Sequence, residues 1–66
     1  MRVLLRNPRR LVEVAGPRRV HELLAELGVR RESVLVIRGD TLVTDDAVLD
    51  DGDEIEVRPV ISGGAL

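Results

Sequence analysis

Residues 20–28 read Val20-His21-Glu22-Leu23-Leu24-Ala25-Glu26-Leu27-Gly28, and this stretch decides the fold. Its larger apolar residues recur at positions i, i+3, i+4 and i+7, which is the spacing of one face of an α-helix. Gly28 follows where a left-handed C-cap is needed, and Pro17 suits a position near the first helical residue. A helix with one apolar face can cover one face of one sheet, so the remaining residues must supply that sheet.

Strand patterns stand on both sides of this helix. Before it, residues 1–6 and 11–14 are separated by the turn signal Asn7-Pro8, which predicts a hairpin. After it, residues 34–37 form a continuous apolar run that is typical of an inner strand. Leu42-Val43 predicts only a short strand.

The best strand pattern is the last one. Residues 54–60 alternate, so that Ile55 and Val57 would face inward while the charged residues between them face outward. The order is thus strand, strand, helix, strand, short strand, strand. It predicts an α+β fold of the β-grasp type, in which a mixed sheet of four to five strands packs on one helix and the last strand lies centrally, beside the first. Residues 1–60 form this domain, and residues 61–66 form a flexible C-terminal tail that carries Gly63-Gly64.

The sheet face opposite the helix is expected to carry Leu4. It carries in addition one alternate pair of the inner strand, either Leu35 and Ile37 or Val34 and Val36. The strand register decides between the two pairs, and the sequence leaves it open. An exposed aliphatic patch there would suit a partner enzyme, and partial cover by loops is the alternative.

Composition excludes several classes of site. The 66 residues contain no Cys, one His and no aromatic residue, so we expect no disulfide, no metal site and an aliphatic core. His21 lies off the apolar stripe of the helix and should be a surface residue. No secretory signal or membrane-spanning run is visible, which favours a cytoplasmic protein that does not enter a membrane.

The formal net charge of −2 hides a strong asymmetry along the chain. Residues 1–38 hold nine Arg against four acids, whereas residues 39–66 hold one Arg against eight acids. The arginines are scattered and no aromatic side chain could stack on bases, so we expect no nucleic-acid partner. The acidic run at residues 50–53 lacks the ligand spacing of a calcium loop and is interpreted as a solvated turn. Acidic residues from Asp45 to Glu56, which we expect beside the tail, could also steer the domain toward a basic partner.

A search for an active site leaves only the tail. Ser33 and Ser62 have no partner but His21 as a base, and no glycine run cradles a phosphate. Gly63 and Gly64, in contrast, follow the last strand directly, and without Cβ atoms they could thread a narrow channel. Because the chain has no Cys, any sulfur that it carries would have to sit on a carboxylate.

The C-terminal stretch also carries a family resemblance. Residues 51–64 resemble the end of the ThiS/MoaD sulfur carriers, in which an acidic Asp-Gly-Asp turn, a final strand and a Gly-Gly tail follow one another. The helix at residues 20–28 and the turn Arg38-Gly39-Asp40 are similar to the corresponding parts of those proteins. The resemblance covers nearly the whole chain.

The resemblance implies a ubiquitin-like carrier that is not an enzyme and binds no cofactor of its own. A ThiF/MoeB-like adenylyltransferase would use ATP to adenylate Gly64, while Ile61, Ser62 and Gly63 thread its active site. A desulfurase or rhodanese would then supply the sulfur that converts the adenylate to a thiocarboxylate. Short length favours thiazole synthase of thiamine biosynthesis as the acceptor. Acceptors in tRNA thiolation, in cysteine or homocysteine synthesis and in molybdopterin synthesis stay open.

Two residues depart from the family pattern. Ala65 and Leu66 follow the second glycine, so Gly64 has no free carboxylate until they are removed. Related carriers with such an extension imply processing between Gly64 and Ala65 by a JAMM-type zinc metalloprotease. The alternatives are a degenerate carrier, a ubiquitin-like modifier that is conjugated to proteins through Gly64, and an inert β-grasp interaction domain.

Overall fold

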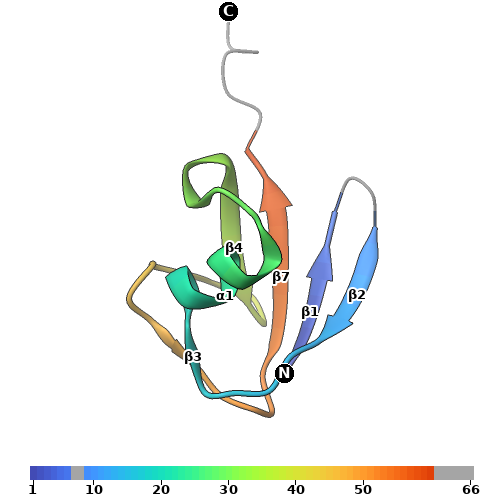
Figure 1. Cartoon of the computed structure of the whole chain (residues 1–66), viewed down its shortest axis with the longest axis vertical. Coiled ribbons are helices and arrows are strands. Elements are labelled where there is room, and N and C mark those ends of the chain that lie inside the picture. Colours follow the sequence, from blue (N-terminus) through green and yellow to red (C-terminus); the bar gives the residue numbers. More distant parts are fainter. Residues whose placement is uncertain (7–8, 61–66) are drawn as a thin grey trace, which may run out of the picture.

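A computed structural model describes residues 1–6 and 9–60, and Figure 1 shows one α-helix packed against a sheet. The sheet is five-stranded and mixed, which confirms the predicted α+β, β-grasp fold. The helix is α1 (Val20–Leu27), and a short 3₁₀ helix, η1 (Arg31–Ser33), follows it. The strands of the sheet, in chain order, are β1 (Arg2–Leu5), β2 (Arg10–Glu13), β4 (Val34–Arg38), β5 (Thr41–Val43) and β7 (Glu54–Pro59).

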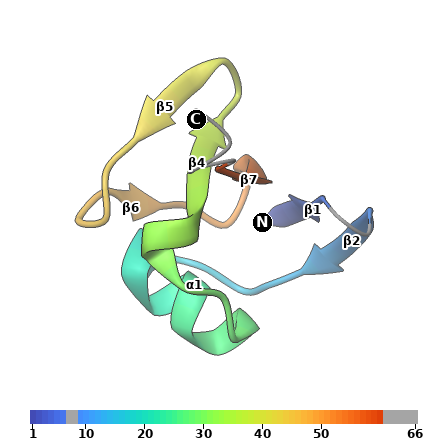
Figure 2. The ribbon, with the colours of Figure 1, turned by 90° about the horizontal axis from the view of Figure 1, so that it is seen from above.

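Strand β7 occupies the centre of the sheet, whose strand order is β2-β1-β7-β4-β5. It runs parallel to β1 and antiparallel to β4, so the prediction that the last strand lies beside the first is confirmed. The predicted hairpin is confirmed by the antiparallel pairing of β1 with β2, although its turn at Asn7-Pro8 lies outside the described residues. Seen from above in Figure 2, α1 lies on one side of the row of strands.

The core lies between α1 and that face of the sheet. Ile55 and Val57 of β7 are 3% and 2% exposed, which confirms the inward orientation predicted from their alternation. They pack with a wholly aliphatic or thioether set of buried side chains, namely Met1, Val3, Val20, Leu23, Leu24, Val36 and Leu49. Burial of each such side chain stabilises the fold by roughly 1.5–3 kcal/mol.

The C-terminal end of α1 confirms the prediction, whereas its N-terminal end differs from it. Gly28 adopts a left-handed conformation with φ of 72°, and its N–H donates to the Ala25 carbonyl at 3.1 Å, which confirms the C-cap. The prediction that Pro17 stands near the first helical residue is wrong, because α1 begins only at Val20. Its N-cap is Arg19, whose backbone N–H donates to the Glu22 carboxylate at 2.9 Å.

Pro17 instead precedes β3 (Arg18–Arg19), which pairs with β6 (Val48–Leu49) in a two-stranded ribbon that the sequence did not predict. Two-residue strands are too short to show any alternation. The ribbon covers the start of α1, where Leu49 is fully buried and the Val20 N–H donates to the Ala47 carbonyl at 3.0 Å.

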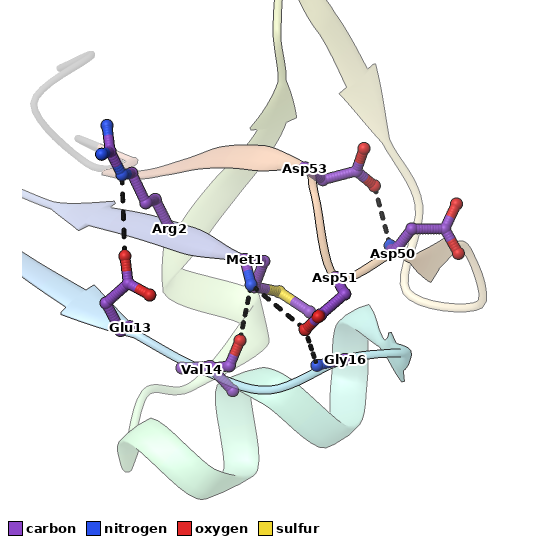
Figure 3. A network of polar contacts seen from close by, with 8 residues as sticks. All are labelled: Met1, Arg2, Glu13, Val14, Gly16, Asp50, Asp51 and Asp53. Atoms are coloured by element: carbon purple, nitrogen blue, oxygen red, sulfur yellow. Dashed lines mark hydrogen bonds and ion pairs between the residues drawn. The ribbon is translucent and has the colours of Figure 1, made fainter.

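The loop between β6 and β7 is fastened to the segment that follows β2 (Figure 3). An Asp51 carboxylate oxygen accepts a hydrogen bond of 2.8 Å from the Gly16 N–H and lies 3.7 Å from the Met1 amino nitrogen. The Gly16 hydrogen bond, and then the positive amino group, hold the pKa of Asp51 below its ordinary value. The backbones nearly touch, because a Cβ on Gly16 would lie 2.9 Å from the Asp51 nitrogen. Glycine is therefore the residue that fits there.

The register also decides which apolar residues face away from α1. Val36 is buried in the core, whereas Leu35 is 44% exposed and Ile37 is half-buried. Leu35 and Ile37 are therefore the pair that shares the second face of the sheet with Leu4. Direct cross-strand pairing adds one residue each from β2 and β5. We call this set the aliphatic outer face: Leu4, Leu11, Leu35, Ile37 and Leu42.

Replacement of Leu23 by alanine should lower the free energy of unfolding by about 2–5 kcal/mol, because the fully buried side chain leaves a cavity. A domain of this size has a stability of roughly 3–10 kcal/mol, so this loss is a large share of the total. Leu11→Ala makes the same chemical change at a side chain that is 64% exposed and should cost less than about 1 kcal/mol. Urea denaturation followed by circular dichroism measures both, and equal losses would contradict the assigned core.

Replacement of Asp51 by asparagine should lower the melting temperature at neutral pH and remove part of its acid dependence. A carboxyl whose pKa is lower in the folded state stabilises the fold above its unfolded pKa, and this is lost as the pH falls through the folded pKa. The gap between Asp51→Asn and the unaltered protein should therefore close as the pH falls below the ordinary value of 3.8. Asp50→Asn is the control, since the Asp50 carboxylate makes no ion pair or hydrogen bond with other described residues. A gap that is constant with pH would contradict this role.

Candidate functional site at the end of the central strand

The predicted site follows β7, so the geometry of this strand positions it. Both edges of β7 pair with neighbouring strands along nearly their whole length, from Arg2 opposite Glu54 to Val34 opposite Pro59. Its alternate side chains, Ile55 and Val57, are anchored in the core. The strand that leads to the tail is thus paired on both sides as far as Val57 and with β4 alone at Arg58 and Pro59, and its core side packs against α1.

One further hydrogen bond fixes the end of the described chain. The Val60 N–H donates to the Ser33 carbonyl at 2.9 Å, which ties the residue after β7 to the end of η1. Figure 1 shows that η1, the start of β4 and the end of β1 all lie at the end of the molecule where β7 finishes. We call this end, around Val60, the root of the tail.

All of the predicted site residues lie beyond this root. Ile61, Ser62, Gly63, Gly64 and Ala65 are outside the described residues, so the roles predicted for them stay predictions. The structure describes the surface from which they continue.

Two arginines and a glutamate meet beside the root. A Glu56 carboxylate oxygen accepts a hydrogen bond of 2.9 Å from the Arg6 Nε and lies 3.4 Å from the Arg58 Nε. Both arginines are exposed, so each contact contributes little to stability. One carboxylate cannot neutralise two guanidinium groups, and positive charge is left at this end of the sheet.

The aliphatic outer face extends from the root across the sheet. A hollow in it runs toward the start of β7, and both apolar and charged residues line it: Arg2, Leu4, Arg9, Leu11, Ile37, Gly39, Glu54, Ile55 and Glu56. Leu11 and Leu42 are 64% and 61% exposed. The central strand divides this face into two aliphatic patches, because Glu56 lies between Leu4 and Ile37 and Arg58 lies opposite Leu35. Exposed aliphatic patches with charged neighbours are typical of contact sites for other proteins.

The expectation that the acidic residues lie beside the tail is wrong for the run at residues 50–53, because this turn precedes β7 and the tail follows it. The carboxylates of the run bind backbone N–H groups nearby. The Asp53 carboxylate accepts a hydrogen bond of 2.8 Å from the Asp50 N–H, and it lies 3.6 Å from an Arg38 nitrogen (Figure 3 shows the first contact). Within residues 1–6 and 9–60, no three acidic or histidine side chains are placed to hold a metal ion. The same residues include no helix that is long and apolar enough to cross a membrane.

The remaining candidates for chemistry are not brought together. Ser33 is exposed on η1, while His21 is half-buried on α1, and its backbone N–H donates to the Asp45 carbonyl at 3.1 Å. No pairing of the two side chains is present among the contacts of the described residues.

Two features of the root were missed by reasoning from the sequence. The charges of Glu56 and Arg58 were recognised as outward-facing, but the contact with Arg6 joins residues fifty positions apart, and no local pattern reveals it. The Ser33 carbonyl is a backbone group, so residue type carries no signal for it.

The chain is similar to known proteins along nearly its whole length. The ThiS family model matches residues 3–64, nearly the whole chain, and the match ends at Gly64. The chain is also 46% identical over 65 residues to a protein named "Sulfur carrier protein TtuB" from Thermus thermophilus, and the match covers 97% of this chain and 100% of that protein. The chain therefore belongs to the ThiS family of sulfur-carrier proteins.

Proposed function

We propose that the working group of this carrier is the carboxylate of Gly64, released when the bond between Gly64 and Ala65 is hydrolysed. The carboxylate attacks ATP in a ThiF/MoeB-like adenylyltransferase, which forms an acyl adenylate and releases pyrophosphate. The outer sulfur of a persulfide on a desulfurase or rhodanese then attacks the acyl carbon and displaces AMP, which forms an acyl disulfide. A second thiol of the partner enzymes attacks the persulfide-derived cysteine sulfur and forms a disulfide with it, and the S–S bond that breaks releases the thiocarboxylate on Gly64. The observation that carries the proposal is the family match, which spans the β-grasp domain and ends at this residue.

The chemistry of the chain supports the carboxylate as the carrier group. A protein can carry sulfur as a persulfide only on a thiol, and the 66 residues contain no Cys. A thiocarboxylate needs only a C-terminal carboxylate and an enzyme that activates it. This chain supplies the carboxylate and the surfaces that present it, whereas the catalytic groups belong to its partners.

The geometry of β7 supports presentation of the tail into a partner. Ile61, Ser62, Gly63 and Gly64 together span at most about 13–14 Å when extended, since each residue adds 3.3–3.6 Å. Their base at Val60 is held by the Ser33 hydrogen bond and by the central strand. The last two positions lack Cβ atoms, so a narrow channel could admit them and place Gly64 at ATP.

The enzyme that accepts the sulfur from Gly64 determines which biosynthetic pathway the carrier serves. We propose thiazole synthase as the first acceptor to test, because the short chain favours it, and tRNA-thiolating, sulfhydrylase-type and molybdopterin-forming enzymes as the others. A JAMM-type metalloprotease is the proposed processing enzyme for Ala65-Leu66.

Intact mass spectrometry of the protein recovered from its own host tests processing and sulfur loading together. We expect loss of the Ala-Leu dipeptide and, in a fraction of molecules, a gain equal to the replacement of one oxygen by sulfur. Only the full-length mass under sulfur-demanding growth would contradict the proposal. Adducts of the chain on other proteins would indicate a modifier that uses the same activated Gly64.

A single methyl group at Gly63 should block activation and leave the fold unchanged. Gly63→Ala narrows the clearance of the tail in a channel, and a misplacement of about 1 Å at a reacting group can lower a rate by about 100-fold. We therefore expect the amount of thiocarboxylate formed to fall by about 10- to 100-fold. Mass spectrometry with the partner enzymes present measures this amount. Gly52→Ala is the matched control, because its new Cβ would have no heavy atom within 4 Å apart from those of its own residue and its two chain neighbours. Equal effects of the two changes, or none at Gly63, would contradict the threading role.

A further inference from the structure

The short reach of the tail constrains every partner that acts on it. Four residues separate Val60 from the carboxylate of Gly64, so the reacting atoms of a partner lie within about 14 Å of the root. A partner that encloses the tail must therefore bring the rim of its channel against the surface around Val60. The charge of that surface becomes part of the recognition.

This surface is strongly basic. Six exposed arginines come from the segments that meet at the root, the end of β1, the start of β2, the loop and helix η1, and the end of β7; we call them the arginine collar: Arg6, Arg9, Arg10, Arg30, Arg31 and Arg58. Three carboxylates share this end of the molecule, those of Glu32, Asp45 and Glu56. Glu56 contacts Arg6 and Arg58, and Asp45 lies 3.2 Å from an Arg31 nitrogen.

The hairpin half of the collar is the least neutralised. Arg9 and Arg10 are exposed and make no ion pair with the other described residues. Arg9 also lines the hollow in the aliphatic outer face, so its charge borders an apolar contact surface. An arginine that borders an apolar surface can bind a carboxylate in two parallel hydrogen bonds when that surface is covered.

The opposite end of the molecule has the opposite sign. There the turn before β7 and the ends of the neighbouring strands hold six carboxylates against Arg2, Arg38 and the Met1 amino group: Glu13, Asp40, Asp50, Asp51, Asp53 and Glu54. Arg18 and Arg19 of β3, which pairs with β6 directly before this turn, reduce the excess of negative charge but lie on the side of the ribbon. The fold thus separates charge along the axis of β7, even though the formal net charge is only −2. A charge distribution of this kind orients a protein as it approaches a charged partner.

We propose that the arginine collar docks against a ring of carboxylates around the tail channel of the adenylyltransferase, and that it orients the carrier tail-first during association. The inference rests on the proposed function, because it takes the activating enzyme as the partner. A protein is favoured over RNA by three observations. The chain has no aromatic side chain to stack on bases, its net charge is negative, and the collar lies at the end of the molecule where Val60 ends the described chain.

The association rate of the full chain with the ThiF/MoeB-like enzyme of its host tests the collar. In stopped-flow or surface-based kinetics we expect the rate constant to fall as ionic strength rises from about 0.05 M to about 0.3 M, because screening shortens the range of the attraction. Arg9→Gln together with Arg10→Gln should slow association by about 3- to 10-fold at the lower ionic strength and flatten the salt dependence.

Arg2→Gln and Arg9→Gln form the matched pair of single variants. Both remove one exposed guanidinium that lines the same hollow, and both change the net charge equally. Arg2 lies at the acidic end, opposite Glu54, so only Arg9→Gln should slow association. Equal rates for the two single variants, or an unchanged salt dependence in the double variant, would overturn the proposal. So would binding of a bulk tRNA sample that the double variant loses, since RNA would then be the partner. If the unaltered chain does not bind the enzyme at any salt concentration, the proposed function fails first and the collar loses its partner with it.

Discussion

Two rows of backbone hydrogen bonds flank β7, one to β1 and one to β4, and they place the last strand of the chain in the middle of the sheet. Ile55 and Val57 fasten the same strand to α1 through the core. The remaining parts of the fold are arranged around this strand, including the ribbon of β3 and β6 that covers the start of the helix. The segment that carries the working carboxylate in our proposal therefore continues from the best-supported part of the molecule.

Much of this could be predicted because the decisive patterns are local. The helical spacing from Val20 to Leu27, the glycine after it and the alternation in β7 each depend on residues close together in the chain. The ribbon of β3 and β6 could not be predicted, since two-residue strands have no period and exist through contacts with α1. For the same reason Pro17 was misplaced: it precedes β3, and the helix begins later. The choice of Leu35 and Ile37 over Val34 and Val36 required the register, which follows from pairing across the sheet.

Some features of the candidate site could likewise be predicted from the sequence, and others could not. The glycine pair and the lack of Cys are properties of the sequence and were sufficient to indicate the tail. The surface around Val60 depends on residues from both halves of the chain, such as Arg6 and Glu56, and emerges only when β1 and β7 lie side by side. The sequence also shows an arginine-rich first half and an acid-rich second half. The fold converts this asymmetry into a basic end and an acidic end of the molecule, because the strands run along one axis. Membership of the ThiS family indicates that the protein carries sulfur. The charged surface around Val60 is the feature by which we expect it to select its partner enzyme.

The placement of β7 has a mechanical consequence. A partner that holds the tail and pulls on it applies force along β7, nearly at right angles to the hydrogen bonds that join this strand to β1 and β4. Such a load is shared by all of these bonds at once in shear, whereas a strand at the edge of a sheet, pulled sideways, loses its bonds one after another. The carrier can therefore withstand a pull on its tail when it leaves the channel of one enzyme for the next. Its fold does not lose β-sheet hydrogen bonds one by one from the C-terminal end.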